Sequence, residues 1–185
     1  MRVDIHPNFL TRAECDELNC WVDAAVANGQ IGLGSTSAMG SLGVDPTRYT
    51  SRGSGSKFVY PQLVRDLSDK IRKFVGVDIY PRISDHGRDG VVVSRTSEGP
   101  GVYPHVDSPM PPYGAWPALR CNVMTRAPER GGVLDIDGTK FPQIGVGDLH
   151  CYLVSVYTHS VGPVFGPVSR VLWMFGAYVP PDFWE

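Results

Sequence analysis

The second half of the chain consists of short runs of β-branched and other apolar residues, separated by turns that contain glycine and proline. Val91-Val92-Val93, for example, lies between Asp89-Gly90 and Gly99-Pro100-Gly101. Such runs are typical of β-strands, because branched side chains pack well on a pleated surface. Strands in this number, with no helix between them, favour a mainly β fold with a double-stranded β-helix (jelly-roll) core. We expect strands at 91–95, 120–125, 133–136, 149–156 and 170–178.

The N-terminal part of the chain has helical patterns instead. Thr11 and Glu14 have the spacing of a capping box, and a helix with an apolar stripe should follow over 12–28. Proline suits the start of a second helix at 61–74, and Gly76 is placed to end it. We therefore predict two or so N-terminal helices that pack outside the β core as supports.

A chain of 185 residues is most simply one domain. We assign helical support and a loop to residues 1–78 and the jelly-roll core to 79–180. Residues 32–56 are rich in glycine and serine. This composition is typical of a surface loop or hairpin, but long loops in small domains are often functional, so a mobile lid is an equal alternative.

Histidine and aspartate side chains in two distant segments point to a metal site. His105 and Asp107 are two residues apart, which places both on the same side of an extended strand. A second histidine, His159, comes from a later strand. Two imidazoles and one carboxylate cover one face of an octahedral ion and leave the other open, as in non-haem ferrous oxygenases. His150 is the most plausible competitor for His159 and ranks below it.

The order of short motifs along the chain strengthens this interpretation. The motifs are Val91-Val92-Val93, Gly99-Pro100-Gly101, His105-x-Asp107, Gly131-Gly132, Gly147-Asp148, His159-Ser160-Val161-Gly162-Pro163-Val164 and Arg170-Val171-Leu172-Trp173. Together they resemble the iron(II)- and 2-oxoglutarate-dependent dioxygenases, and within them the prolyl 4-hydroxylase-like branch. The resemblance covers roughly residues 90–178 well and the N-terminal half loosely.

The resemblance implies a ligand set and a reaction. Ferrous iron would be held by His105, Asp107 and His159, and Arg170 would pair with the distal carboxylate of 2-oxoglutarate. Dioxygen and 2-oxoglutarate would be consumed, succinate and carbon dioxide released, and an organic substrate hydroxylated. Ascorbate is an optional auxiliary. Related halogenases carry a small residue in place of the aspartate, so Asp107 argues against that activity.

Three further arginines are candidates for binding an acidic group. Arg95 stands ten residues before His105, where the family commonly has a tyrosine that helps to bind the cosubstrate. If the strand register turns Arg95 inward, it must meet a carboxylate of 2-oxoglutarate, of the substrate or of the protein. Our hypothesis is that Arg95 contacts 2-oxoglutarate or an acidic substrate group. Arg120 and Arg126 are further candidates, although ordinary surface charge is the favoured interpretation for Arg126.

Composition excludes several classes of partner. The net charge of −2, without a basic run, gives no electrostatic support for nucleic-acid binding. No apolar stretch approaches a membrane span, and no secretory signal is visible. The four cysteines include no Cys-x-x-Cys pair. We therefore expect free, mostly buried thiols in a reducing, cytoplasmic compartment, with no nucleic-acid or membrane partner.

The substrate is left open between three functions. The first is hydroxylation of an amino-acid side chain in a peptide or protein, and the second is hydroxylation of a free amino acid or small metabolite. The third is a non-catalytic, cupin-like binding module. We expect a monomer or dimer in each case.

Overall fold

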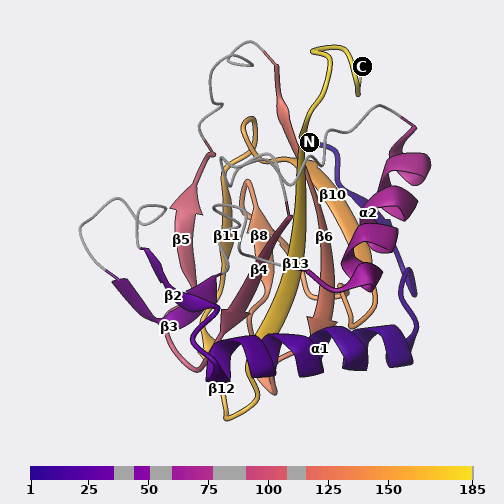
Figure 1. The fold of residues 1–185 in the computed structure, drawn as a ribbon. Coiled ribbons are helices and arrows are strands. Elements are labelled where there is room, and N and C mark those ends of the chain that lie inside the picture. The colour runs from indigo at the N-terminus through magenta and orange to yellow at the C-terminus, as the bar shows by residue number, and fades with distance from the viewer. Residues whose placement is uncertain (36–43, 51–59, 77–90, 108–115, 185) are drawn as a thin grey trace.

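Antiparallel strands pair into three sheets in the computed structural model, which describes residues 1–35, 44–50, 60–76, 91–107 and 116–184 (Figure 1). The large sheet has the order β1 (Asp4–His6), β10 (Leu149–Leu153), β6 (Ala118–Arg126), β13 (Arg170–Tyr178), β4 (Val91–Thr96), β3 (Val44–Thr50) and β2 (Gly32–Ser35). The smaller sheet has the order β5 (Val102–His105), β11 (His159–Val161), β8 (Leu134–Ile136) and β9 (Thr139–Phe141). A two-stranded ribbon joins β12 (Val164–Phe165) to β7 (Arg130–Gly131). The prediction of a mainly β fold is confirmed.

Two helices, α1 (Arg12–Ala27) and α2 (Gln62–Val75), cover one face of the large sheet (Figure 1). Helix α1 begins with the predicted capping box, in which Glu14 N–H donates to the Thr11 hydroxyl and Thr11 N–H donates to the Glu14 carboxylate. Helix α2 ends at Gly76, whose φ of 74° is left-handed. Both predicted helices are therefore confirmed within about two residues at each end.

Strand alternation gives the large sheet two faces with different surroundings. The outer face packs on the helices, and its largest fully buried side chains include Trp173 and Phe175 of β13. The inner face turns toward the smaller sheet, where Tyr152 of β10 packs with Leu134 and Ile136 of β8. A side chain's function therefore depends on which of the two faces it occupies.

The glycine- and serine-rich segment 32–56 contributes two paired strands. β2 and β3 form an antiparallel ladder, and β3 pairs with β4 at the edge of the large sheet. The backbone at 32–35 and 44–50 thus has the antiparallel pairing of a hairpin, which was one of the two alternatives for this segment. The other alternative, a mobile lid, concerns residues 36–43 and 51–56, which lie outside the described residues.

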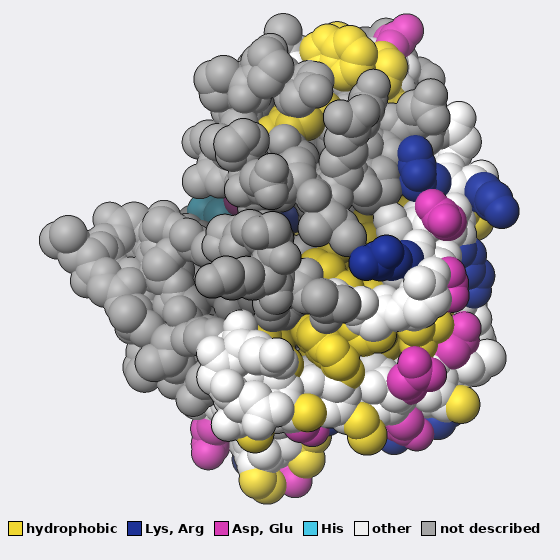
Figure 2. Space-filling model, viewed as in Figure 1, with side chains coloured by type: hydrophobic (Ala, Val, Ile, Leu, Met, Phe, Trp, Pro, Cys, Tyr) yellow, Lys and Arg dark blue, Asp and Glu magenta, His cyan; other side chains and the backbone are white. Residues whose placement is uncertain are grey.

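The surface that Figure 2 shows carries acidic and basic side chains interspersed along the side where the helices lie. This mixture provides no extended basic field on the described part of that surface. No described helix has the length and apolar character of a membrane span. All four cysteines are free thiols, and only Cys20 is exposed, as predicted.

Candidate metal centre

Two neighbouring strands of the smaller sheet bring the two predicted histidines together. His105, the last residue of β5, lies directly opposite His159, the first residue of β11. Their ring centroids are 4.3 Å apart. Gly101 permits this approach, because its φ is +83° and a Cβ there would lie only 2.3 Å from the carbonyl oxygen of Val161.

The third predicted residue, Asp107, is fixed just beyond the end of β5. Its backbone N–H donates to the carbonyl oxygen of Val154, at 2.9 Å. One carboxylate oxygen, Oδ1, lies 3.5 Å from Nε2 of His105, while Oδ2 accepts a hydrogen bond from Arg120 at 3.0 Å. The carboxylate is therefore held in one orientation, with a single oxygen turned toward the histidines.

Both imidazole rings are oriented by backbone carbonyl groups. Nδ1 of His105 lies 2.8 Å from the carbonyl oxygen of Tyr103, and Nδ1 of His159 lies 3.2 Å from that of Tyr157. A carbonyl oxygen only accepts, so each Nδ1 must carry the proton. Each neutral ring then has its lone pair on Nε2, which is the tautomer that a metal ligand needs.

The charge state of the group also suits a cation. Burial, followed by the proximity of His105, lowers the pKa of His159, so its ring is neutral at pH 7. Burial raises the pKa of Asp107, but the adjacent His105 ring and the charge and hydrogen bond of Arg120 outweigh burial. The pKa of Asp107 is held well below its usual range, and the carboxylate stays ionised.

The three side chains meet the requirements of one metal ion. Ligand atoms of His105, Asp107 and His159 all lie within 4.8 Å of one another, and no other such group occurs among the described residues. Neighbouring ligands of an octahedral ion, each at about 2.1 Å, are roughly 3 Å apart. Small side-chain movements would therefore place all three donors on one ion. This donor set is typical of non-haem ferrous sites, and His150 is not part of it.

Arg170, the predicted cosubstrate residue, lies on the inner face of the large sheet. It begins β13 and is only 5% exposed. Gly132 leaves room for its aliphatic stem, since a Cβ at that position would lie 3.0 Å from Cδ of Arg170. The Arg170 charge acts on Tyr152, whose ring contacts that of His159 with centroids 5.4 Å apart. Arg170 is therefore on the same side of the large sheet as His159.

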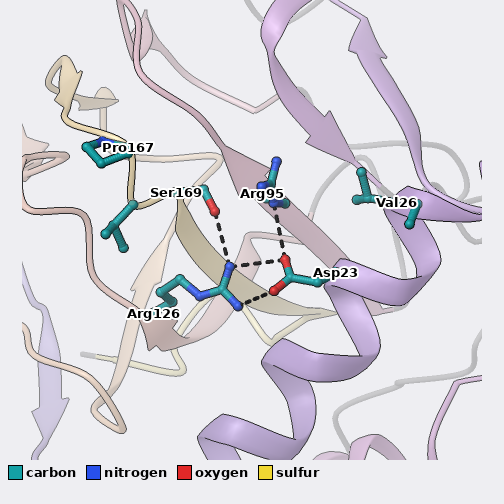
Figure 3. A pocket seen from close by; sticks show the side chains of 8 residues that line it. Asp23, Val26, Arg95, Arg126, Pro167 and Ser169 are labelled. Atoms are coloured by element: carbon teal, nitrogen blue, oxygen red, sulfur yellow. Dashed lines mark hydrogen bonds and ion pairs between the residues drawn. The ribbon is translucent and has the colours of Figure 1, made fainter.

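Arg95 occupies the opposite, outer face. It pairs across β4 and β13 with Val171, which belongs to the core under the helices. Its Nε lies 3.4 Å from Asp23 of α1, and Arg126 also donates to Asp23, at 2.6 Å (Figure 3). These charged groups line a pocket of about 480 Å³ beside Ser169. The hypothesis that Arg95 contacts 2-oxoglutarate or an acidic substrate group is therefore corrected, because the strand register directs it to α1.

Two inner-face residues had roles that the sequence pattern did not reveal. Arg120 was a candidate for binding an acidic group of the cosubstrate or substrate, but the acidic group that it contacts is Asp107. Tyr152 is buried against His159, and burial raises its pKa to about 12 despite the opposing charge of Arg120. Alternation along β10, with Tyr152 two residues after His150, was the signal available for this placement.

Solved structures with the same fold provide a comparison. A prolyl hydroxylase from Trichoplax adhaerens, in complex with a peptide fragment of the hypoxia inducible factor oxygen degradation domain, superposes with a TM-score of 0.66 at 17% identity, over 94% of this chain and 83% of that one. A viral collagen prolyl hydroxylase from Paramecium bursaria Chlorella virus-1, in complex with 2-oxoglutarate, gives 0.63 at 18% identity, over 97% of both chains.

HygX from Streptomyces hygroscopicus, with nickel, 2-oxoglutarate and hygromycin B bound, gives a TM-score of 0.59 at 13% identity, over 97% of this chain and 83% of that one. No family model and no curated protein matches the sequence. Identity at this level supports a statement about fold alone. The chain therefore has the fold of the prolyl hydroxylases, and the resemblance read from its sequence is confirmed at that level.

Proposed function

We propose that the protein is an iron(II)- and 2-oxoglutarate-dependent oxygenase. The observation that supports this best is the convergence of His105, Asp107 and His159, with both Nδ1 atoms tied to backbone carbonyl groups. A chance cluster of two histidines and an aspartate has no reason to orient both rings with Nδ1 on a backbone carbonyl group. The fold is also shared with a 2-oxoglutarate complex of a prolyl hydroxylase.

In this proposal each residue of the site has one task. His105, Asp107 and His159 hold the ferrous ion, and Arg120 restrains the second oxygen of Asp107. Ferrous iron and 2-oxoglutarate, when bound, supply the oxidation of a C–H bond by dioxygen, in which one oxygen atom enters the product alcohol and the other enters succinate, with release of carbon dioxide. Arg170 binds the distal carboxylate of 2-oxoglutarate, for which a planar guanidinium is well suited.

The finer description of the fold belongs to the same proposal. The inner face of the large sheet and the smaller sheet would form the two halves of a double-stranded β-helix, with the metal group between them. The chain would be a single domain, with residues 1–78 supporting a core over 79–180. The free, mostly buried thiols fit a reducing compartment such as the cytoplasm.

The substrate that we favour is an amino-acid side chain in a peptide or protein. A protein of the same fold binds a peptide fragment. Apolar side chains next to the metal group are exposed here, with Tyr103 at 57% and Val106 at 45% on either side of His105. A flexible peptide would bury such side chains on binding. The alternative of a small metabolite is supported by the structure that contains hygromycin B.

Succinate formation tests the proposal and separates it from a non-catalytic binding module. The purified protein should release succinate only when iron(II), 2-oxoglutarate and a substrate are supplied, and ascorbate should prolong the activity. Peptide and amino-acid libraries, screened for hydroxylated products, would then distinguish the two substrate classes.

Substitution of the three proposed ligands tests the site itself. His105→Ala, Asp107→Ala and His159→Ala should each abolish turnover and weaken iron binding measured by calorimetry, while circular dichroism stays unchanged. His6→Ala, a histidine on β1 outside the group, is the matched control and should keep full activity. Undiminished iron binding in any of the three variants would remove that residue from the ligand set.

A further inference from the structure

A second buried histidine lies on the inner face of the large sheet and has no role in the proposed metal group. His150 is 1% exposed, and its direct partner across β10 and β6 is Asn122, at 2%. Neighbouring positions on the same face hold ordinary core residues, such as Val154. Polar side chains at such depth are unfavourable unless their hydrogen bonds are satisfied.

One of the two ring nitrogens of His150 is satisfied and the other is not. Nδ2 of Asn122 lies 3.3 Å from Nε2 of His150. The amide nitrogen only donates, so Nε2 accepts and the proton of the neutral ring sits on Nδ1. This Nδ1 is buried and has no hydrogen-bond partner among the described residues. The described residues therefore offer this buried N–H donor no acceptor.

The neighbours of this donor point to an anionic ligand. Burial and then the charge of Arg170 lower the pKa of His150 to about 3, so the ring is neutral at pH 7 and Arg170 is close by. Tyr152 stacks parallel to His150, with ring centroids 6.3 Å apart, and also senses the Arg170 charge. Asp107, the acidic group that acts on Tyr152, is already held by Arg120. A guanidinium and an N–H donor thus occur together in the interior of the fold.

We propose that the Nδ1–H of His150 donates to the distal carboxylate of 2-oxoglutarate, the same carboxylate that Arg170 binds. The inference rests on the proposed function. A carboxylate has about four lone-pair directions, so it accepts from the guanidinium and the imidazole at once. Asn122 acts as a positioning residue, because its amide fixes the tautomer. The pair thereby selects a 2-oxo acid with a second carboxylate over one with an apolar tail.

A purely structural histidine is the competing explanation. Such a residue would satisfy both ring nitrogens within the fold, because the pairing would then offset the cost of burial. Among the described residues His150 satisfies one nitrogen only, and the charge of the buried Arg170 acts on its ring. The arrangement is instead that of a preorganised site whose last hydrogen bond comes from a ligand.

Calorimetric binding to the full chain, with manganese(II) replacing iron to prevent turnover, tests the inference. The variants are His150→Leu, which removes the donor, and His150→Gln, which restores one. Cys151→Ala is the matched control, because Cys151 is buried on the same strand but faces the helices. The ligands are 2-oxoglutarate and 2-oxopentanoate, which has a methyl group in place of the distal carboxylate.

Loss of a hydrogen bond to a charged group should make His150→Leu bind 2-oxoglutarate roughly 10- to 100-fold more weakly than the wild type. His150→Gln should recover part of the affinity, and Cys151→Ala should bind like the wild type. The affinity for 2-oxopentanoate should not fall in His150→Leu. Equal affinity of wild type and His150→Leu for 2-oxoglutarate would overturn the role of His150, as would an equal loss for both ligands. A wild-type protein that binds no 2-oxoglutarate at all would instead overturn the proposed function, and this inference with it.

Discussion

The buried, neutral His150 should make the protein sensitive to acid. In the folded chain its pKa is lowered from 6.5 to about 3 by burial and by the charge of Arg170. The unfolded chain therefore takes up a proton near pH 6.5, which the folded chain does not bind until about pH 3. Across that window the unfolded state binds more protons, so stability is lost as the pH falls.

The size of the effect follows from linkage. Each pH unit below the unfolded pKa costs about 1.4 kcal/mol for one proton. Integration between pH 7.5 and pH 5 gives about 2 kcal/mol from His150 alone, and roughly 5 kcal/mol over the whole window. A His150→Leu variant has no such proton to bind, whereas His159 and the carboxylates contribute equally to both proteins.

Urea unfolding of wild type and His150→Leu at the two pH values provides the measurement. The wild type should lose about 2 kcal/mol more than the variant between pH 7.5 and pH 5, with unchanged urea m-values. The absolute stability of the variant is irrelevant to this difference. Parallel losses in the two proteins would show that His150 is protonated in the folded state, and would refute the buried neutral ring.

Two substitutions on the two faces of the large sheet and one at the start of α1 give further tests. Arg170→Ala should weaken 2-oxoglutarate binding by at least about tenfold in calorimetry and leave iron binding unchanged, because the guanidinium binds the cosubstrate only. Arg95→Leu should leave 2-oxoglutarate affinity within about twofold of wild type, since its side chain meets Asp23 on the outer face. Thr11→Ala should lower the free energy of urea unfolding by about 1 kcal/mol through loss of the capping box, with no effect on either ligand.

The sequence predicted the elements whose signals are local. The capping box and the left-handed glycine set the ends of α1 and α2 through the chain's own neighbouring residues. The turn at Asp137-Gly138 likewise has positive φ at both residues, which the Asp-Gly pair accommodates. The pairing of strands is not local. The order of the large sheet, in which β10 and β4 lie on opposite sides of β6 and β13, could not be read from any single segment.

Strand register explains why the meeting of His105 with His159 was predicted correctly and the placement of Arg95 was not. His105 and His159 could be chosen as metal ligands from the sequence alone, because a His-x-Asp pair and a later histidine need only meet at one point. Arg95 depended on which face of β4 it occupies, and a shift of one residue reverses that assignment. The structure buries both of its neighbours, Ser94 and Thr96, to 4% exposure or less. Alternation assigns both of them to the inner face, so the inward position belongs to a small hydroxyl residue and the arginine to the helix side.

The same alternation indicates a role for His150 that its sequence context did not reveal. As a possible metal ligand, His150 was only a weaker competitor of His159. In the sequence Leu-His-Cys-Tyr-Leu of β10, however, every second residue faces inward, which places His150 and Tyr152 together on the face that holds Arg170. The alternate residues Leu149 and Cys151 point the other way and pack in the core under the helices. One strand thus supplies packing on one side and, in our proposal, a hydrogen-bond donor for the cosubstrate on the other.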